Sequence, residues 1–319
     1  MLSNFFQIFL LISPVFILII LGNILRRVGV PDISFWEVND KLVYWVLIPS
    51  LLFHHISQIH LSSSMIYSYG VVILSGLFIV TIVSVLMGKL LGYSPESWSS
   101  ILQGAARHNA FIALAIAGSL FGDEGLAIGA VFMLLYVPSI NIVVISIMVS
   151  NLKQPGQADT TKGIANIFIE LIKNPFILAM IAGLFVSLIE SDKLIIVHET
   201  SGLLGSAALP IMLLTIGAKI KVRDLALKMT PIIISNSLKL IAFPVIAYIV
   251  ASSMGLSQLE VVVAVIFASV PTAASSHALA KQFGGDEQLM TSIVTTQVAL
   301  SFITIPVILA VITLSLIHI

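Results

Sequence analysis

The chain has 319 residues, of which 58% are hydrophobic and 9% are charged, and its formal net charge is zero. Soluble globular domains carry about 25% charged residues, so this composition excludes a soluble enzyme of this size. The zero net charge gives no support for a nucleic-acid partner, and the absence of cysteine excludes a disulfide framework and thiolate metal sites. The composition predicts an all-α protein that crosses a lipid bilayer many times.

Ten apolar runs lie between clusters of charge, glycine and serine, and each has the length of a membrane helix. They cover 5–25, 38–57, 65–88, 99–121, 125–149, 164–189, 200–218, 229–253, 259–282 and 288–316. A polar segment rich in Gly, Pro, Gln and Thr divides the chain nearly in half. We therefore predict a first five-helix repeat at 1–149, a linker at 150–163 and a second five-helix repeat at 164–319.

The two halves share a pattern of proline, glycine and phenylalanine. The matching pairs, at offsets of 161 or 162 residues, are Pro14 with Pro175, Gly22 with Gly183, Pro49 with Pro210, and Phe121-Gly122 with Phe283-Gly284. Because each half has five runs, an odd number, the second half is expected to enter the membrane upside down. Inverted repeats are typical of secondary transporters and place the substrate site near the bilayer midplane.

The fourth and ninth runs contain the strongest signals for a broken helix. Arg107, His108 and Asn109 lie within the fourth run, where a charged side chain at the helix centre costs at least about 2.5–3.5 kcal/mol. Asn109 is a good N-cap for a new half-helix. In the ninth run, Pro271 interrupts the preceding helix and suits the first turn of the following one. The 162-residue offset places Asn109 on Pro271, so the two breaks are predicted to be symmetry-related.

Such breaks occur in membranes only where they are packed in protein or line a wet cavity. We expect the amino ends of the two following half-helices, with their unpaired N–H groups, to face one central space. The guanidinium of Arg107 makes this space an anion site, and a carboxylate fits because guanidinium binds it bidentately. The candidate substrate-binding residues are Arg107, His108, Asn109, Asn141, Pro271, Thr272, Ser275, Ser276 and Gln297.

Some of these residues also have a purely structural interpretation. Arg107 can bind carbonyl groups of the scaffold instead of a substrate, and Ser275 and Ser276 can bond back to the preceding helical turn. Lys239, in the eighth run, either lines a cavity or extends its ammonium toward the interface. The candidates for proton coupling are His108, His277 and Lys239.

Motifs of enzymes and ATP-driven pumps are missing. The sequence contains no Walker or dinucleotide glycine motif and no HExxH or GxSxG signature. Every Asp and Glu lies in a loop or near the end of an apolar run. We therefore expect a non-enzyme without a metal or another cofactor.

Four segments resemble the auxin efflux carrier family of membrane transporters. They are VFILIILGNILRRVGV, NDKLVYWVLIPSLLF, YVPSINIVVISIM and the most specific, SVPTAASSHALAKQFGGDEQLMTSIVTTQVALSFITIPVILAVI. The resemblance covers the whole chain. It implies ten helices in inverted repeats, with the fourth and ninth crossing as in the bile-acid sodium symporter fold. It also implies a crossover domain that moves against a scaffold of helices 1, 2, 6 and 7, and a homodimer formed through that scaffold.

The crossover departs from the plant members of this family, which carry auxin. Their Asn-Pro-Asn type motif is replaced here, although Asn109 and Pro271 match the crossover positions, and the linker has about fourteen residues instead of a long loop. Bacterial relatives are associated with small organic acids. The resemblance therefore favours a bacterial-type carrier of organic acids.

Together, the patterns and the resemblance predict a secondary transporter or facilitator of small organic anions that works by elevator-type alternating access. Its expected partners are the anion, protons as a candidate co-substrate, and the lipid of a bacterial inner membrane. Two alternatives stay open: a sodium-coupled organic-anion symporter of the bile-acid type, and a membrane sensor domain that does not transport. Flux that depends on a sodium gradient would favour the symporter, and binding without flux would favour the sensor.

The basic residues predict the orientation, because lysine and arginine concentrate in cytoplasmic loops. One set of alternate loops and helix ends holds twelve of the fifteen: Arg26, Arg27, Lys41, Lys89, Lys153, Lys162, Lys173, Lys219, Lys221, Arg223, Lys228 and Lys281. The opposite set holds Lys193. This bias places both termini on the periplasmic side and the linker in the cytoplasm.

The orientation can be tested with single cysteines, because the natural chain has none. We expect an impermeant thiol reagent to label Ser3→Cys in intact cells and to label Gly156→Cys after the cells are opened. Labelling of Gly156→Cys but not of Ser3→Cys in intact cells would reverse the orientation.

Overall fold

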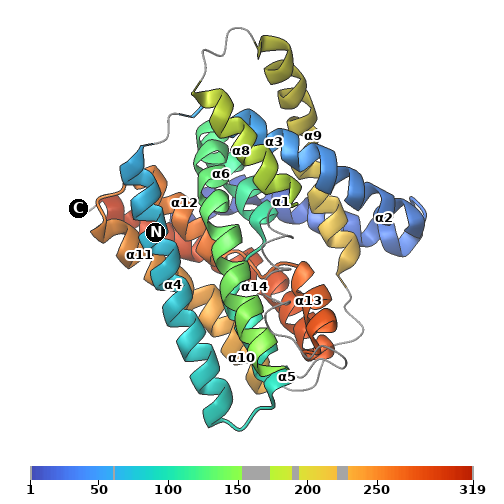
Figure 1. Cartoon of the computed structure of the whole chain (residues 1–319), viewed down its shortest axis with the longest axis vertical. Helices are drawn as coiled ribbons and strands as arrows, with labels where there is room; N and C mark the ends of the chain where they lie inside the picture. The colour runs from blue at the N-terminus through green and yellow to red at the C-terminus, as the bar shows by residue number, and fades with distance from the viewer. Residues whose placement is uncertain (1, 60–61, 153–172, 189–193, 221–228, 318–319) are drawn as a thin grey trace.

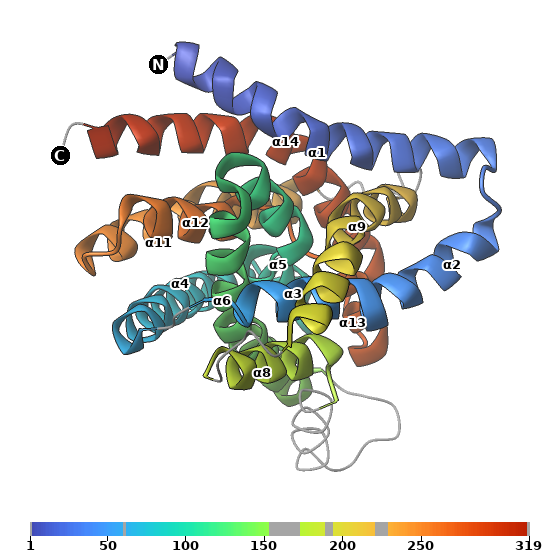
Figure 2. The same cartoon turned by 90° about the horizontal axis from the view of Figure 1, so that it is seen from above.

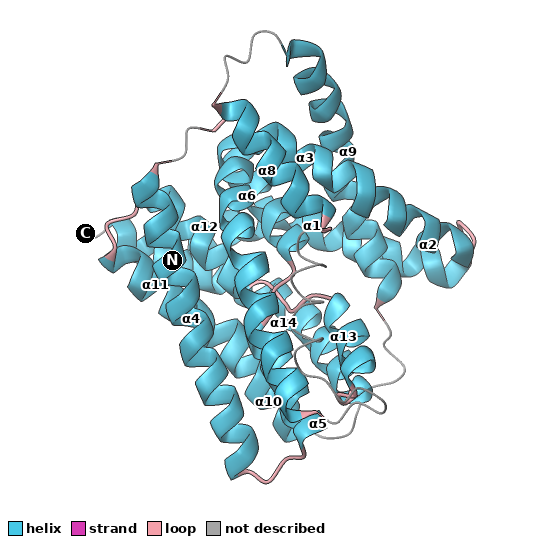
Figure 3. Cartoon of the chain, in the orientation of Figure 1, coloured by secondary structure: helices cyan, strands magenta, loops and turns pink. Residues whose placement is uncertain are grey.

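The computed structural model describes residues 2–59, 62–152, 173–188, 194–220 and 229–317. All regular structure in these ranges is helical, and they contain no β-strand (Figure 3). Six helical stretches in this part of the chain are long and apolar enough to cross a bilayer. The prediction of an all-α, multi-pass membrane protein is confirmed.

The helices coincide with the predicted apolar runs (Figure 1). In chain order they are α1 (Leu2–Val28), α2 (Ile33–Leu42), η1 (Val43–Leu47), α3 (Ile48–Ile56), α4 (Ser63–Leu90), α5 (Pro95–Ala106), α6 (Ala110–Asn151), α8 (Pro175–Ser187), α9 (Ile195–Lys219), α10 (Met229–Ser237), η3 (Leu238–Ala242), α11 (Phe243–Ser253), α12 (Gln258–Ser269), α13 (Ser275–Phe283) and α14 (Glu287–Ile317). Most of the predicted linker, together with the start of the sixth run, falls outside the described residues.

Two kinds of irregularity interrupt these helices. Helix α6 joins the second half of the fourth run to the fifth run and turns sharply at Gly122, whose φ of 58° and ψ of −141° suit a residue without a side chain. The turns η1 and η3 are π-helical. Each lies directly before a helix that contains a proline near its start, Pro49 in α3 and Pro244 in α11. The apolar pattern does not predict the π-helical turns.

The helices pack in two groups. Helices α1, α2, η1, α3, α8 and α9 contact one another, and we call them the scaffold helices. The second group, α4, α5, α6, α10, η3, α11, α12, α13 and α14, is called the crossover helices. The two groups meet through α6, which contacts α1, α3, α8 and α9, and through the pair α1 and α14. Helices α1 and α14 lie side by side, with the beginning of α1 and the end of α14 directed toward the same end of the molecule (Figure 2).

Glycines set the closest contacts within the scaffold. A Cβ atom at Gly22 of α1 would lie 2.0 Å from the backbone oxygen of Leu214 in α9, and one at Gly217 of α9 would lie 1.8 Å from that of Ile19. The backbones of α1 and α9 therefore touch directly. Gly183 of α8 makes a similar but looser contact with α3, where a Cβ would lie 3.0 Å from the side chain of Ile56.

We expect Gly217→Ala to lower the melting temperature of the purified protein, because its methyl group has to push α1 and α9 apart. Overpacking of this kind costs about 1–3 kcal/mol. Gly70→Ala is the control, since a Cβ at this glycine of α4 meets nothing within 4 Å and alanine is the better helix former. Equal melting temperatures for both variants would contradict the close contact.

Candidate functional site

The two broken helices meet at their breaks. Helix α5 ends at Ala106 and α6 begins at Ala110, while α12 ends at Ser269 and α13 begins at Ser275. The backbone N–H of Asn109 donates to the carbonyl oxygen of Pro271, with 2.7 Å between nitrogen and oxygen. The predicted breaks are therefore confirmed, and a hydrogen bond joins the two residues that the 162-residue offset relates.

Side chains from three other segments donate to carbonyl groups at the end of α5. The Thr272 hydroxyl donates to the Gln103 carbonyl (3.2 Å), and the Gln297 amide donates to the Gly104 carbonyl (3.0 Å). The hydroxyl of Tyr136, on α6, donates to the carbonyl of Ala106. An unpaired buried carbonyl would be costly in a bilayer, so these side chains stabilise the break.

The amino ends of the two following half-helices differ. The Asn109 side chain accepts a hydrogen bond from the backbone N–H of Ile112 at 3.3 Å, so the predicted N-cap of α6 is confirmed. Helix α13 has no side-chain cap. The prediction that Pro271 occupies the first turn of α13 is wrong, because the helix begins at Ser275. Pro271 lies instead in the non-helical link, where its carbonyl is held by Asn109.

Arg107 contacts Asn141, another predicted site residue. Arg107 follows the end of α5 with an extended backbone and is half-buried. Its Nη1 donates to the Asn141 side-chain oxygen at 3.1 Å, and its Nε has no hydrogen-bond partner among the described residues. The guanidinium is thus fixed at the crossing, with part of its donor capacity unused.

His108 and Lys239 lie deeper among the crossover helices. The ring of His108 meets the ring of Tyr136 edge-on, with 3.9 Å between the ring centres, and also contacts Phe267. Lys239 is fully buried, and its ammonium lies 4.7 Å from the ring centre of Phe243. Neither residue lines either of the two cavities described next.

A cavity of about 540 Å³ reaches the crossing. We call it the crossing cavity. Asn109, Thr272, Ala274 and His277 line it from the crossover helices. The opposite wall comes from the ends of α1, α2 and α9, with the charged side chains Arg26, Glu37, Asp40, Lys41 and Lys219. The uncapped amino end of α13 therefore opens on a cavity whose far end is charged.

The polar residues around this cavity are partly paired. The Lys219 ammonium lies 2.6 Å from the Asp40 carboxylate. His277 hydrogen-bonds Thr291 at 3.0 Å through Nδ1, and its Nε2 lies 3.9 Å from the Glu287 carboxylate. Of the other predicted site residues, Ser275 is the exposed first residue of α13, the buried Ser276 hydroxyl lies 3.3 Å from that of Thr272, and Gln297 accepts from the Thr272 N–H at 2.8 Å.

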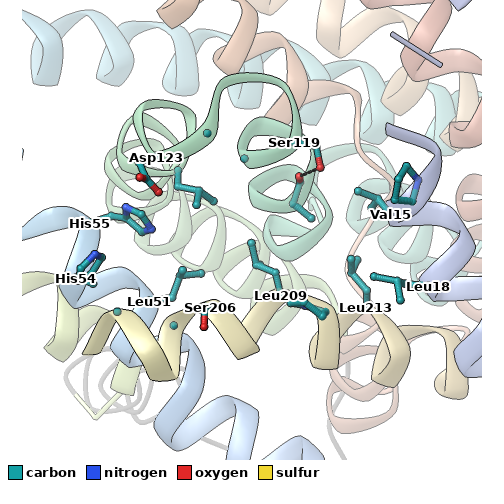
Figure 4. A pocket seen from close by; sticks show the side chains of 18 residues that line it. Val15, Leu18, Leu51, His54, His55, Ser119, Asp123, Ser206, Leu209 and Leu213 are labelled. Carbon is teal, nitrogen blue, oxygen red and sulfur yellow. Dashed lines mark hydrogen bonds between the residues drawn. The ribbon is translucent and has the colours of Figure 1, made fainter. Parts of the chain in front are cut away.

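A second cavity of about 450 Å³ lies between the scaffold helices and the first half of α6 (Figure 4). We call it the histidine cavity, because His54, His55 and Asp123 gather at one end of it. The histidine cavity is lined by residues between 202 and 213 of α9 and between 14 and 18 of α1. The crossing cavity is lined by residues between 216 and 220, at the end of α9 and just after it, and by Arg26 of α1. The cavities therefore occupy successive levels of the same two scaffold helices.

Several residues of this region are missing from the sequence-based candidates. The sequence signal for Tyr136 is its position at the start of YVPSIN, a polar and proline-containing interruption of an apolar run. The charged residues at the far end of the crossing cavity come from the consecutive helices α1 and α2 and from the distant α9, so no local pattern brings them together. Within the described ranges, no group of three His, Asp or Glu residues is placed to hold a metal ion.

Comparison with known proteins adds two findings. A family model described as "Membrane transport protein" matches residues 7–309. An "Uncharacterized transporter" of Methanothermobacter thermautotrophicus is 23% identical over 309 residues, which cover 92% of this chain and 95% of that protein. Both matches extend over nearly the whole chain, so they include both broken helices.

We expect Gln297→Leu to destabilise the crossing, because the Thr272 N–H and the Gly104 carbonyl both lose their partner. Each unsatisfied buried group costs about 1–3 kcal/mol, which a thermal unfolding scan detects. Gln288→Leu is the matched control, since Gln288 is an exposed residue of the same helix. If both variants melt like the natural protein, Gln297 does not stabilise the break.

Proposed function

Because the chain belongs to the membrane transport protein family, as its resemblance to the auxin efflux carriers predicts, we propose that it is a secondary transporter or facilitator of small organic anions. The observation that carries this proposal is the crossing cavity, which connects charged side chains at the ends of three helices with the amino end of α13. The proposed substrate site lies at the inner end of this cavity.

The chemistry at this end of the cavity favours an anion. The first N–H groups of α13 have no side-chain cap, and the amino end of a helix attracts negative charge. The Thr272 and His277 side chains line the same space. Arg107, two residues before the cavity-lining Asn109, adds a fixed positive charge at the crossing. The Ser276 and His277 N–H groups already donate to the carbonyl oxygens of Ala273 and Ala274, so a carboxylate is attracted by the positive end of the α13 dipole while Arg107 balances its charge.

The two cavities support alternating access. Both lie against α1 and α9 of the scaffold at successive levels, and their other walls include α6 in the histidine cavity and α13 and α14 in the crossing cavity. If the crossover helices slide along the scaffold, the substrate site at the crossing passes from one cavity to the other. This movement is the elevator mechanism. The direct contact of α1 with α9 through Gly22 and Gly217 suits a scaffold that stays rigid meanwhile.

The glycine contacts also support the ten-helix inverted repeat. The first and sixth runs are equivalent in the predicted repeat, and so are the second and seventh. Gly22 packs the first run on the seventh, and its equivalent Gly183 packs the sixth run on the second. These are the pairs that a two-fold repeat would relate. We also propose a homodimer through the scaffold in a bacterial inner membrane, with both termini periplasmic and the crossing cavity open to the cytoplasm.

The proposal also includes proton coupling as the energy source of transport. Of the three coupling candidates, His277 lines the crossing cavity, whereas His108 and Lys239 line neither cavity. A group that loads a proton together with the substrate needs access to the substrate's compartment. His277 is therefore the candidate that best fits proton coupling, and uptake that is independent of pH would favour facilitated diffusion.

The proposed function is tested by uptake into proteoliposomes with a panel of mono- and dicarboxylates, at controlled pH and sodium. For the best substrate we expect Arg107→Ala to weaken the apparent affinity about ten- to a hundredfold, the range for losing a charge-assisted hydrogen bond. Arg107→Lys should restore part of it, because lysine keeps the charge but not the bidentate fork.

Lys41→Ala is the matched control, since this lysine lines the charged far end of the crossing cavity and is exposed. Its effect should be small and should vanish at high salt, where surface charges are screened. Uptake of no carboxylate would reject the proposed function. Wild-type uptake by Arg107→Ala would reject the role of Arg107 alone.

A further inference from the structure

The histidine cavity has an imidazole with unused hydrogen-bonding capacity at one end. His55, on α3, is 8% exposed and lines this cavity. No hydrogen bond joins its ring to a described residue, although the ring contacts that of His54, with 5.2 Å between the ring centres. His54 is engaged, because its Nδ1 lies 3.1 Å from the carbonyl oxygen of His198. A buried imidazole that faces a cavity without a partner is free to bind a ligand.

Asp123 faces the same end of the cavity from the opposite wall. It follows the kink of α6 at Gly122, and Figure 4 shows it beside His55, which comes from α3. The Asp123 carboxylate lies close enough for its charge to act on the His55 ring, but it forms no ion pair with a described residue. A Cβ atom at Gly122 would meet nothing within 4 Å, so space is open at the kink.

The charge at this end of the cavity favours a cation. With histidine neutral, Asp123 carries the only formal charge among the described residues that line the cavity. The available groups are a carboxylate and an imidazole nitrogen, and both accept hydrogen bonds. A primary ammonium, which has a positive charge and three donors, matches this pair of acceptors.

The rest of the cavity is mainly apolar. Its volume of about 450 Å³ falls in the range of about 300–1,000 Å³ that is typical of small-molecule sites. Away from Asp123 and His55, aliphatic side chains make up most of the wall (Figure 4), namely those of Val15, Leu18, Leu51, Leu126, Leu209 and Leu213. A matching ligand therefore has a charged head and an apolar body. A bare metal ion does not match, because no group of three His, Asp or Glu residues in the described ranges is placed to hold one.

We propose that the histidine cavity binds an amphipathic organic cation, a primary ammonium on an apolar chain. The ammonium donates to the Asp123 carboxylate and to a ring nitrogen of His55, and the chain lies along the aliphatic wall. The site shares no residue with the proposed substrate site. Because the cavity separates the scaffold helices from the first half of α6, a bound amine blocks the sliding of the crossover helices. This last consequence alone rests on the proposed function.

Thermal unfolding of the purified full-length protein in lipid nanodiscs tests the site. The melting temperature is measured at neutral pH with n-hexylammonium chloride, n-hexanol or sodium hexanoate, at equal concentration and ionic strength. The three probes share one apolar chain, so hexanol reports what the chain itself does to the lipid. We expect hexylammonium to raise the melting temperature above the hexanol value by at least about 3 °C in a saturable way, as a ligand of the folded state does.

Absence of this rise would overturn the proposal, and so would a larger rise with hexanoate, since the cavity would then receive an anion. Asp123→Asn should abolish the rise. Glu124→Gln is the matched control, because Glu124 is the adjacent exposed acid of α6 but does not line the cavity. A rise that survives in Asp123→Asn, or is lost equally in Glu124→Gln, rejects the assignment. If Asp123→Asn does not fold, Leu209→Trp replaces it, because the larger side chain fills the cavity.

The effect on transport is measured in proteoliposomes. We expect hexylammonium to inhibit carboxylate uptake by the natural protein and by Glu124→Gln, but not by Asp123→Asn. Binding without inhibition would contradict the block of sliding and leave the site itself supported. If no carboxylate is taken up at all, the proposed function fails, and the melting temperatures still decide whether the amine binds.

Discussion

The crossing depends on one constraint: two helices are broken where no bulk water can solvate their freed backbone groups. The chain meets this constraint because groups of each break form hydrogen bonds with groups of the other. Asn109 donates to Pro271 through the backbone, and Thr272, from the second break, donates to a carbonyl of the first. Gln297 bridges the two, because its amide oxygen accepts from the second break and its amide nitrogen donates to the first.

This mutual dependence explains why polar side chains from several crossover helices gather at the two breaks. The scaffold helices touch through glycine and backbone, and the Asn23 and Arg26 side chains of α1 add hydrogen bonds to the carbonyl oxygens of Gly217 and Ala218 in α9. Among the crossover helices, the breaks create unpaired groups, and side chains from α6 and α14 reach in to satisfy them. The same geometry leaves the amino end of α13 uncapped and facing a cavity. The proposed substrate site therefore lies where a helix amino end without a side-chain cap meets a cavity.

The sequence predicts the parts of this arrangement that are local. The breaks follow from Pro271 and from a polar triplet in an apolar run, and the cap at Asn109 needs a side chain to reach only three residues along the chain. The hydrogen bond of Tyr136 with the Ala106 carbonyl joins residues 30 positions apart. It depends on the angle between two helices, which the spacing of apolar residues in the sequence does not predict. The far wall of the crossing cavity has the same origin, since its charges come from the ends of three separate helices.

Pro271 shows what a proline does when it lies neither inside a helix nor at its start. Any other residue in the link between α12 and α13 would bring a backbone N–H that needs an acceptor in a medium without free water. Proline has no backbone N–H, so no acceptor is needed at this position. Pro271 therefore offers its carbonyl oxygen to Asn109 without adding an N–H group of its own, and the neighbouring Thr272 supplies the donor in the opposite direction. A membrane protein that has to unwind a helix can lower the free-energy cost by placing proline in the unwound segment, because fewer backbone N–H groups then need a hydrogen-bond partner.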